Sequence, residues 1–223
     1  MSDLFDYLNE GISSLHPYEP GRSIEDVIAE YRPEKIVKLA SNENPLGPSP
    51  KAVEALNLHN DDLHLYPDGD SKKLKALIAK HESLDVSNII IGNGSNEVLE
   101  LAARAFLNKD TSALMSKHAF AVYKIVTQSN GSKTIEVPTI DWRHALNDFS
   151  NYIEDSTRVC FVANPNNPTG TYNSHDEFKS MMDAIPSSIL VILDLAYFEY
   201  VTEQDYVRVN ELLDNYSNLL VTK

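Results

Sequence analysis

The stretch RVCFVANPNNPTGT, residues 158–171, decides the fold of this chain. Its first part, residues 158–164, is an apolar run that predicts a buried strand. Two Asn-Pro steps and a Thr-Gly pair follow, and this chemistry predicts a rigid, extended turn. Residues 175–185 (HDEFKSMMDAI) predict a helix, and residues 188–194 (SILVILD) predict a second apolar strand. This order of strand, helix and strand is typical of an α/β domain with a parallel sheet.

The same alternation continues on both sides of this stretch. On the carboxyl side, a helix is predicted over 209–216 and a strand over 218–223. On the amino side, strands are predicted at 88–92, 112–116 and 133–138, and helices at 96–107, 119–128 and 144–153. We therefore expect a three-layer α/β/α architecture with a mostly parallel sheet.

The first third of the chain is richer in turns. Ser23 begins a predicted helix over 23–31 and has Asp26 three residues on, which indicates a capped start. A short strand is predicted at 36–40, and further helices at 50–56, with Pro50 in the first turn, and at about 71–81. We expect residues 1–35 to form an arm with a helix and residues 36–223 to form the main domain.

Composition excludes several classes of partner. The 223 residues carry 33 acidic against 19 Lys and Arg side chains, a formal charge of −14, which disfavours nucleic acid and anionic membranes as partners. There is no signal-peptide pattern and no apolar run of about 20 residues, so the expected location is the cytoplasm. The single cysteine, Cys160, lies in an apolar run and is expected to be buried, and the seven histidines lack metal-ligand spacing.

The first candidate for binding is the segment IIIGNGSNEVLEL, where a predicted strand leads into Gly92, Gly94, Ser95 and Asn96 and a helix begins. Glycines let the backbone approach a ligand, and a helix N-terminus offers free N–H groups and a partial positive charge. This combination suits a phosphate. An ordinary strand-to-helix turn with Asn96 as its cap explains the same residues.

Two further candidates follow apolar strands. Asn167 in the Asn-Pro turn could donate an amide hydrogen bond to a phenolate or carbonyl oxygen. Asp194 ends the run ILVILD and would need a cationic partner if it is buried, while Tyr197 places a hydroxyl nearby. The alternatives are a structural Pro-rich turn and an Asp that caps the next turn.

Four weaker candidates depend on their context. Phe120 could stack on a flat ring, although a helix-core aromatic is the simpler interpretation. Tyr66 is an aromatic in a Pro/Gly loop, and Asn42 and Asn44 lie in SNENPLGPSP, where they could serve only as turn residues.

Taken together and in this order, the motifs resemble fold-type I pyridoxal-phosphate (PLP) aminotransferases, and most of all the histidinol-phosphate aminotransferases. The pieces are YEPGRSIEDVIAEY, IVKLASNENPLGPSP, LHLYPDGD, IIIGNGSNEVLELAARAFL, HAFAVYKIVTQ, FVANPNNPTGT and VILDLAYFEY, from about Tyr18 to the C-terminus. Leu195 departs from the family pattern, which usually has Glu after the aspartate.

The resemblance implies a role for each candidate. Gly94, Ser95 and Asn96 would bind the PLP phosphate, Phe120 would stack on the pyridine ring, and Asn167 and Tyr197 would hydrogen-bond its phenolic oxygen. Asp194 would pair with the pyridine nitrogen, so that Asp194 and Tyr197 serve the chemistry most directly. Tyr66 would reach the phosphate in a neighbouring subunit's site, which implies a homodimer. Tyr18 and Asn44 would lie on the substrate side.

The implied reaction moves an amino group between histidinol phosphate and 2-oxoglutarate, the keto acid that corresponds to glutamate, in histidine biosynthesis. A threonine-phosphate decarboxylase, an aromatic aminotransferase or a non-catalytic PLP-binding chain stay open as alternatives. The resemblance aligns Lys223 with the basic residue just before the family's Schiff-base lysine segment. It therefore implies that this lysine and the C-terminal small domain lie outside the 223 residues, and that the chain as given is inactive.

Overall fold

The computed structural model describes residue 8, residues 11–15 and residues 21–223. The chain divides into two compact units, one of Met1–Pro17 with Lys73–Lys223 and one of Tyr18–Lys72. Each unit is described separately below.

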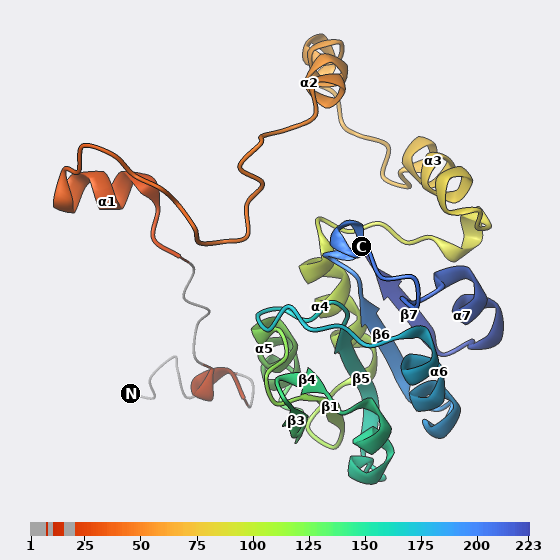
Figure 1. Cartoon of the computed structure of the whole chain (residues 1–223). Coiled ribbons are helices and arrows are strands. Elements are labelled where there is room, and N and C mark those ends of the chain that lie inside the picture. Colours follow the sequence, from red (N-terminus) through yellow and green to blue (C-terminus); the bar gives the residue numbers. More distant parts are fainter. Residues whose placement is uncertain (1–7, 9–10, 16–20) are drawn as a thin grey trace, which may run out of the picture. The chain divides into compact units, whose positions relative to one another are not determined.

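The larger unit is built on a five-stranded sheet in the order β2-β1-β5-β6-β7. The strands are β1 (Ser112–Ser116), β2 (Lys133–Val137), β5 (Thr157–Ala163), β6 (Leu190–Asp194) and β7 (Leu219–Thr222). All four pairings between neighbours are parallel, and the sheet lies between helices in Figure 1. The expected three-layer α/β/α fold with a mostly parallel sheet is confirmed.

Successive strand residues point to opposite faces of the sheet. Because both faces carry apolar side chains, helices cover both of them. On one face, α4 (Ser95–Phe106) and α5 (Ala121–Ser129) pack on Met115, Phe161 and Ile192. On the other, α6 (His175–Ala184) and α7 (Val209–Asn215) pack on residues of the alternate register, such as Val162 and Leu193. Cys160 lies on this second face and is fully buried, as expected; burial raises the pKa of its thiol.

The order of connection creates a crevice at one edge of this sheet. The chain goes from β1 to β2 on one side and then returns to β5 on the other side of β1, so the order reverses between β1 and β5. Ligands of open α/β sheets bind outside the carboxyl ends of the strands at such a reversal. At this edge Ala163 pairs with Asp194, and Asp194 pairs with Thr222, so β5, β6 and β7 end at the same level.

Three sequence predictions are wrong in detail. Residues 36–40 and 88–92 form no strand, because neither segment has a strand beside it among the described residues to complete a backbone ladder. The predicted helix at 144–153 is a 3-10 helix over Leu146–Tyr152 (η5). Its first residue, His144, belongs instead to a short antiparallel pair, β3 (Thr139–Ile140) with β4 (Arg143–His144).

The other predicted elements are confirmed to within a few residues, including α3 (Lys72–Glu82). The described residues of the larger unit also form short 3-10 helices at η2 (Ile12–Ser14), η4 (Val86–Asn88) and η6 (Phe198–Tyr200). No helix in the described part of the chain is both long and apolar enough to cross a bilayer.

The smaller unit holds α1 (Ile24–Tyr31), α2 (Pro50–Asn57) and η3 (Asn60–Asp62). The Ser23 side chain accepts a hydrogen bond from the Asp26 backbone N–H at 3.0 Å, so the predicted N-cap of α1 is confirmed. Pro50 stands in the first turn of α2, as predicted.

Candidate functional site

The loop before α4 brings backbone close to the helix N-terminus. Gly94 is the N-cap and has φ +80°, a left-handed conformation that favours glycine. A Cβ on Gly92 would lie 2.9 Å from Val98 and 3.2 Å from the Glu97 carboxylate, so this position also requires glycine. The loop therefore presents Ser95 and the free N–H groups of α4 at the carboxyl edge of the sheet.

Phe120 follows β1 and is the N-cap of α5. Its ring packs edge-on against Tyr123 of the same helix, with centroids 5.7 Å apart. Tyr123 in turn stacks on Phe161 of β5, with centroids 4.9 Å apart and ring planes 8° from parallel. Phe120 thus stands at the start of α5, where it packs against the core and also lines the cavity at the edge of the sheet.

The turn after β5 is held by asparagines at both ends. The Asn164 side chain donates to the Asn173 carbonyl at 2.9 Å and accepts from the Asn173 N–H at 2.8 Å. The Asn166 amide donates to the His118 carbonyl at 2.9 Å, and Tyr206 donates to the Asn164 carbonyl. Burial raises the pKa of Tyr206, which keeps its hydroxyl protonated as a donor. These bonds fix the segment that carries Asn167.

Asp194 ends β6 and is only 4% exposed. One carboxylate oxygen accepts from the Tyr123 hydroxyl at 2.8 Å, and the other accepts from the Ala196 N–H at 3.2 Å. Among the described residues, no Lys, Arg or His side chain forms an ion pair with Asp194. A buried carboxylate with two neutral donors still favours a cation in contact with it.

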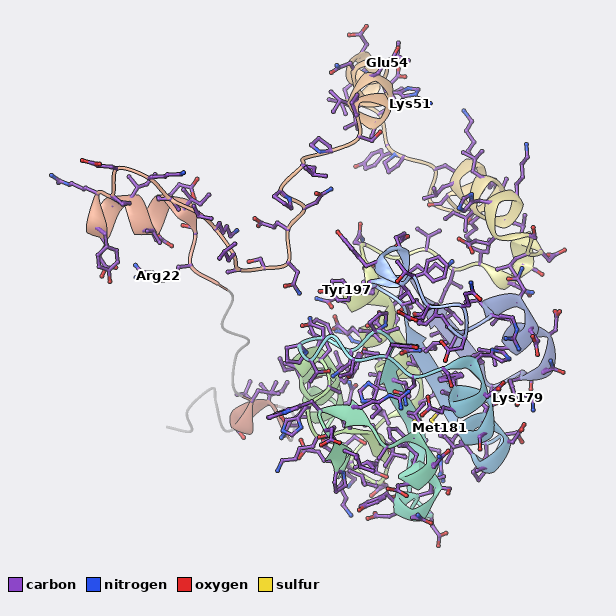
Figure 2. All side chains as sticks on the ribbon, viewed as in Figure 1. Arg22, Lys51, Glu54, Lys179, Met181 and Tyr197 are labelled. Atoms are coloured by element: carbon purple, nitrogen blue, oxygen red, sulfur yellow. The ribbon has the colours of Figure 1, made fainter. Side chains whose placement is uncertain are left out.

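These loops converge on one cavity of about 190 Å³. Its lining residues are Ser95, Phe120, Ala163, Pro165, Asn167, Asp194, Ala196 and Tyr197. Figure 2 shows Tyr197 at the end of the sheet, away from Met181 of α6 in the core. Five of the residues singled out from the sequence thus surround one space: a helix N-terminus, an aromatic ring, an amide, a carboxylate and a phenol.

The remaining sequence candidates lie elsewhere. Gly94 and Asn96 flank Ser95 without lining the cavity. Asn44 and Tyr66 belong to the smaller unit; Asn44 closes a turn by accepting from the Leu46 N–H at 3.0 Å, and Tyr66 is fully exposed. Tyr18 lies outside the described residues.

His144 supports a strand that lines the site, and sequence reasoning missed it. Its Nδ1 lies 2.7 Å from the Ser116 hydroxyl and its Nε2 lies 2.8 Å from the Ala163 carbonyl, so it joins the ends of β1 and β5 across the crevice. Burial lowers the pKa of His144 to about 4; the Ala163 carbonyl raises it and the Arg143 cation lowers it to a smaller degree. The neutral imidazole therefore links the two strand ends. In the sequence, only a prediction of the short hairpin β3–β4, which carries His144, could have placed it there.

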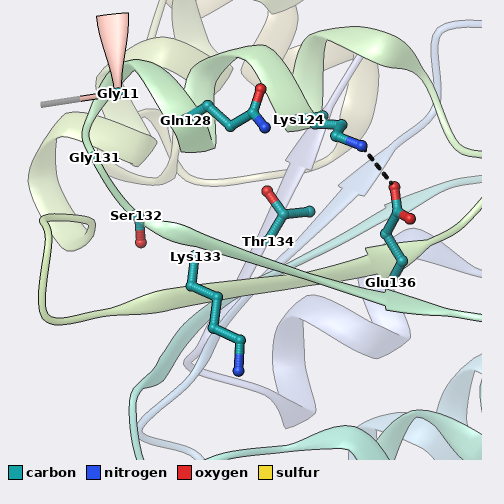
Figure 3. Close-up of a pocket in the computed structure, with 8 residues that line it drawn as sticks. All are labelled: Gly11, Lys124, Gln128, Gly131, Ser132, Lys133, Thr134 and Glu136. Atoms are coloured by element: carbon teal, nitrogen blue, oxygen red, sulfur yellow. Dashed lines mark hydrogen bonds and ion pairs between the residues drawn. The ribbon is translucent and has the colours of Figure 1, made fainter. Parts of the chain in front are cut away.

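A larger hollow, of about 560 Å³, lies beside α5 and β2 and is not where the candidate residues meet (Figure 3). It is open to solvent, and its two lysines are paired with carboxylates: Lys124 with Glu136 at 3.2 Å and Lys133 with Glu154 at 2.5 Å. We take the smaller cavity as the candidate site because it contains the buried Asp194 carboxyl group, which forms no ion pair with a described residue.

Lys223 is the lysine nearest the end of β7. Its amine lies 2.6 Å from the Glu82 carboxylate and 4.3 Å from the centroid of the Phe198 ring. It is not among the residues that line the Asp194 cavity. This geometry holds the amine in an ion pair rather than in the site.

The family described as aminotransferase class I and II matches residues 34–223. The chain belongs to this family. The chain is 45% identical over 215 residues to histidinol-phosphate aminotransferase 2 of Pseudomonas fluorescens, covering 96% of this chain and 58% of that protein. It is 42% identical over 212 residues to histidinol-phosphate aminotransferase of a Geobacillus species, covering 95% and 58%. The chain thus spans somewhat under three fifths of the length of these curated relatives.

Solved structures of an aminotransferase and of a decarboxylase share the fold. Histidinol-phosphate aminotransferase from Sinorhizobium meliloti, solved in complex with pyridoxal-5'-phosphate, superposes with a TM-score of 0.87 at 23% identity, over 97% of this chain and 58% of that one. L-threonine-O-3-phosphate decarboxylase from Porphyromonas gingivalis superposes with a TM-score of 0.63 at 22% identity, over 77% and 50%. At these identities the likeness establishes the fold of this chain.

Proposed function

We propose that this chain is the cofactor-binding part of a PLP-dependent aminotransferase that moves an amino group between histidinol phosphate and 2-oxoglutarate in histidine biosynthesis. The observation that carries the proposal is the convergence of Ser95, Phe120, Asn167, Asp194 and Tyr197 on one cavity in a chain of the aminotransferase family.

The donor set of the cavity fits PLP. A protonated pyridine nitrogen is the kind of cation that the buried Asp194 carboxylate favours. The amide of Asn167 and the hydroxyl of Tyr197 are donors suited to a phenolic oxygen, and Phe120 offers an aromatic face or edge. The N-terminus of α4, with Gly94 and Ser95, suits a phosphate dianion.

When bound, PLP supplies an electron sink for the α-carbon of the substrate. The part of this chain in that chemistry is to bind and orient. The Asp194 carboxylate would hold a proton on the ring nitrogen, and the ring of Phe120 would pack against the cofactor. The bonded turn that carries Asn167 keeps its amide in place, so that no reorganisation is needed during the reaction.

Substrate choice is the finer part of the proposal. The relatives at 42–45% identity are named histidinol-phosphate aminotransferases, which supports histidinol phosphate. We propose that the protein acts as a homodimer, with Tyr66 reaching the neighbouring subunit's phosphate site and with Tyr18 and Asn44 on the substrate side. The complete exposure of the Tyr66 side chain supports a contact with a neighbouring subunit.

Cofactor binding is tested by equilibrium dialysis of PLP against this chain, Asp194→Ala and Asp183→Ala. Asp183 is an exposed carboxylate on α6 that pairs with Lys179, so its removal controls for the loss of one negative charge. We expect Asp194→Ala to weaken binding at least tenfold and Asp183→Ala to leave it unchanged. Equal affinity for all three would contradict the assignment of the site.

The reaction is tested on the full-length gene product with histidinol phosphate and 2-oxoglutarate, following glutamate formation. Threonine phosphate serves as the competing substrate. Release of carbon dioxide from threonine phosphate without glutamate formation from histidinol phosphate would overturn the substrate assignment and leave the cofactor assignment standing.

A further inference from the structure

Tyr123 is a fully buried residue on α5 whose hydroxyl contacts the carboxylate of the candidate site. Its hydroxyl donates to one oxygen of Asp194 at 2.8 Å. Burial, and to a smaller degree the Asp194 charge, raise the pKa of Tyr123 well above its ordinary value. The phenol therefore keeps its proton and remains a donor to Asp194 throughout the physiological range.

The ring of Tyr123 cannot easily move away from this contact. It stacks on Phe161 of β5 and makes a T-shaped contact with the ring of Phe120. Its own carbonyl accepts from the Thr127 hydroxyl at 2.7 Å, one helical turn on. A buried side chain held by two aromatic neighbours aims its hydroxyl in a single direction.

The contact with Tyr123 also restricts rotation of the Asp194 side chain. With Tyr123 on one oxygen and the Ala196 N–H on the other, rotation of the carboxylate would break two hydrogen bonds. Each oxygen still has a free lone pair, and Asp194 lines the cavity with Asn167 and Tyr197. The carboxylate is thus locked in one rotamer with acceptor capacity left for a ligand.

We propose that Tyr123 is a positioning residue that locks the Asp194 carboxylate toward the ring nitrogen of the cofactor. This inference rests on the proposed function, because it assigns the free acceptor of Asp194 to PLP. Two residues of the α5 region would then act on the cofactor ring. Phe120, the N-cap of α5, would contact the ring itself, and Tyr123 would orient Asp194, the partner of the ring nitrogen.

A purely structural tyrosine would predict a different result from a positioning one. Loss of a structural hydroxyl would loosen the cavity and weaken every ligand that fits it. Loss of a positioning hydroxyl would weaken only those ligands that contact Asp194. The discriminating pair of ligands is PLP and its deaza analogue, in which a C–H group replaces the ring nitrogen.

The experiment is equilibrium dialysis of both ligands against the chain, Tyr123→Phe and Tyr216→Phe. Tyr123→Phe keeps the ring and removes only the hydroxyl. Tyr216→Phe is the matched control, because Tyr216 also donates to an aspartate, Asp183, but at an exposed site just after α7. We expect Tyr123→Phe to weaken PLP roughly tenfold, the effect of one hydrogen bond to a charged group, and to leave the analogue unchanged. Tyr216→Phe should change neither affinity.

Failure of the inference and failure of the proposed function give different results. Equal weakening of both ligands by Tyr123→Phe, or no weakening, would overturn the positioning role while the chain still binds PLP. A chain that binds PLP no better than the analogue would overturn the contact between Asp194 and the nitrogen, and one that binds neither would overturn the proposed use of the cofactor.

A second measurement needs no cofactor. In the ligand-free chain we expect a slowly exchanging hydroxyl proton in the NMR spectrum that is absent from Tyr123→Phe. This resonance should shift in Asp194→Asn and remain in place in Asp183→Asn. Absence of the resonance, or a resonance insensitive to Asp194→Asn, would overturn the inference whatever the binding data give.

Discussion

The link that His144 forms between β1 and β5 predicts an acid-sensitive contribution to stability. At pH 7 the imidazole is neutral in both the folded and the unfolded chain. As the pH falls below 6.5, the unfolded chain binds a proton that the folded chain binds only near pH 4, so acid favours unfolding. From these two pKa values, His144 accounts for a loss of about 2 kcal/mol in unfolding free energy between pH 7 and pH 4.5.

The perturbation is His144→Gln, measured by urea unfolding at pH 7, 5.5 and 4.5 against the unchanged chain. At pH 7 the variant should be less stable by about 1–3 kcal/mol, because the Ser116 hydroxyl and the Ala163 carbonyl lose a fitted partner. By pH 4.5 this difference should narrow by about 2 kcal/mol, since the variant has no imidazole to protonate. Other titrating groups are common to both proteins and cancel.

His81→Gln is the control, because His81 is an exposed imidazole on α3. Its stability should follow that of the unchanged chain at all three pH values. A difference between His144→Gln and the unchanged chain that stays constant from pH 7 to 4.5 would refute the reasoning. It would mean that the folded chain admits a proton at His144 as readily as the unfolded one.

Three further predictions concern the turns and the buried thiol. Asn164→Ala removes both side-chain bonds between the buried Asn164 and Asn173 and should lower stability by about 2–4 kcal/mol in urea unfolding; a loss below about 0.5 kcal/mol would contradict the role of this pair. Gly94→Ala forces a side chain to φ +80° and should cost about 1–3 kcal/mol, whereas Gly69→Ala, where a Cβ meets open space, should cost less than about 1 kcal/mol in the same assay. Cys160 should react with an aromatic disulfide reagent only after urea unfolding, and rapid reaction of the folded chain would show that the second face of the sheet is open.

Most of the fold could be predicted from the sequence because the central parallel strands, β1, β5 and β6, are buried on both faces. β5 and β6 appear as apolar runs, and the turns and helices between them carry strong Pro, Gly and capping signals. The predictions failed where pairing depends on distant partners. Residues 36–40 and 88–92 have strand-like composition, but a strand also needs a neighbour with which to share hydrogen bonds.

The candidate site was predictable where a residue directly follows a strand, and less so where it supports another residue. Asn167, Asp194 and Tyr197 follow β5 and β6 and therefore meet at the edge of the sheet. Tyr123 and His144 act through contacts made 71 and 28 residues away in the chain, with Asp194 and Ser116. No local pattern of composition or spacing encodes such a contact.

The level ending of β5, β6 and β7 has a consequence for how this architecture can change over evolutionary time. Ala163, Asp194 and Thr222 are fixed to one another by the backbone ladder, and the loops that follow them are not part of that ladder. Insertions or substitutions in those loops could alter which small molecule is accepted without moving the carboxylate at the end of β6. Inheritance of the cofactor and divergence of the substrate would then be governed by separate parts of the chain.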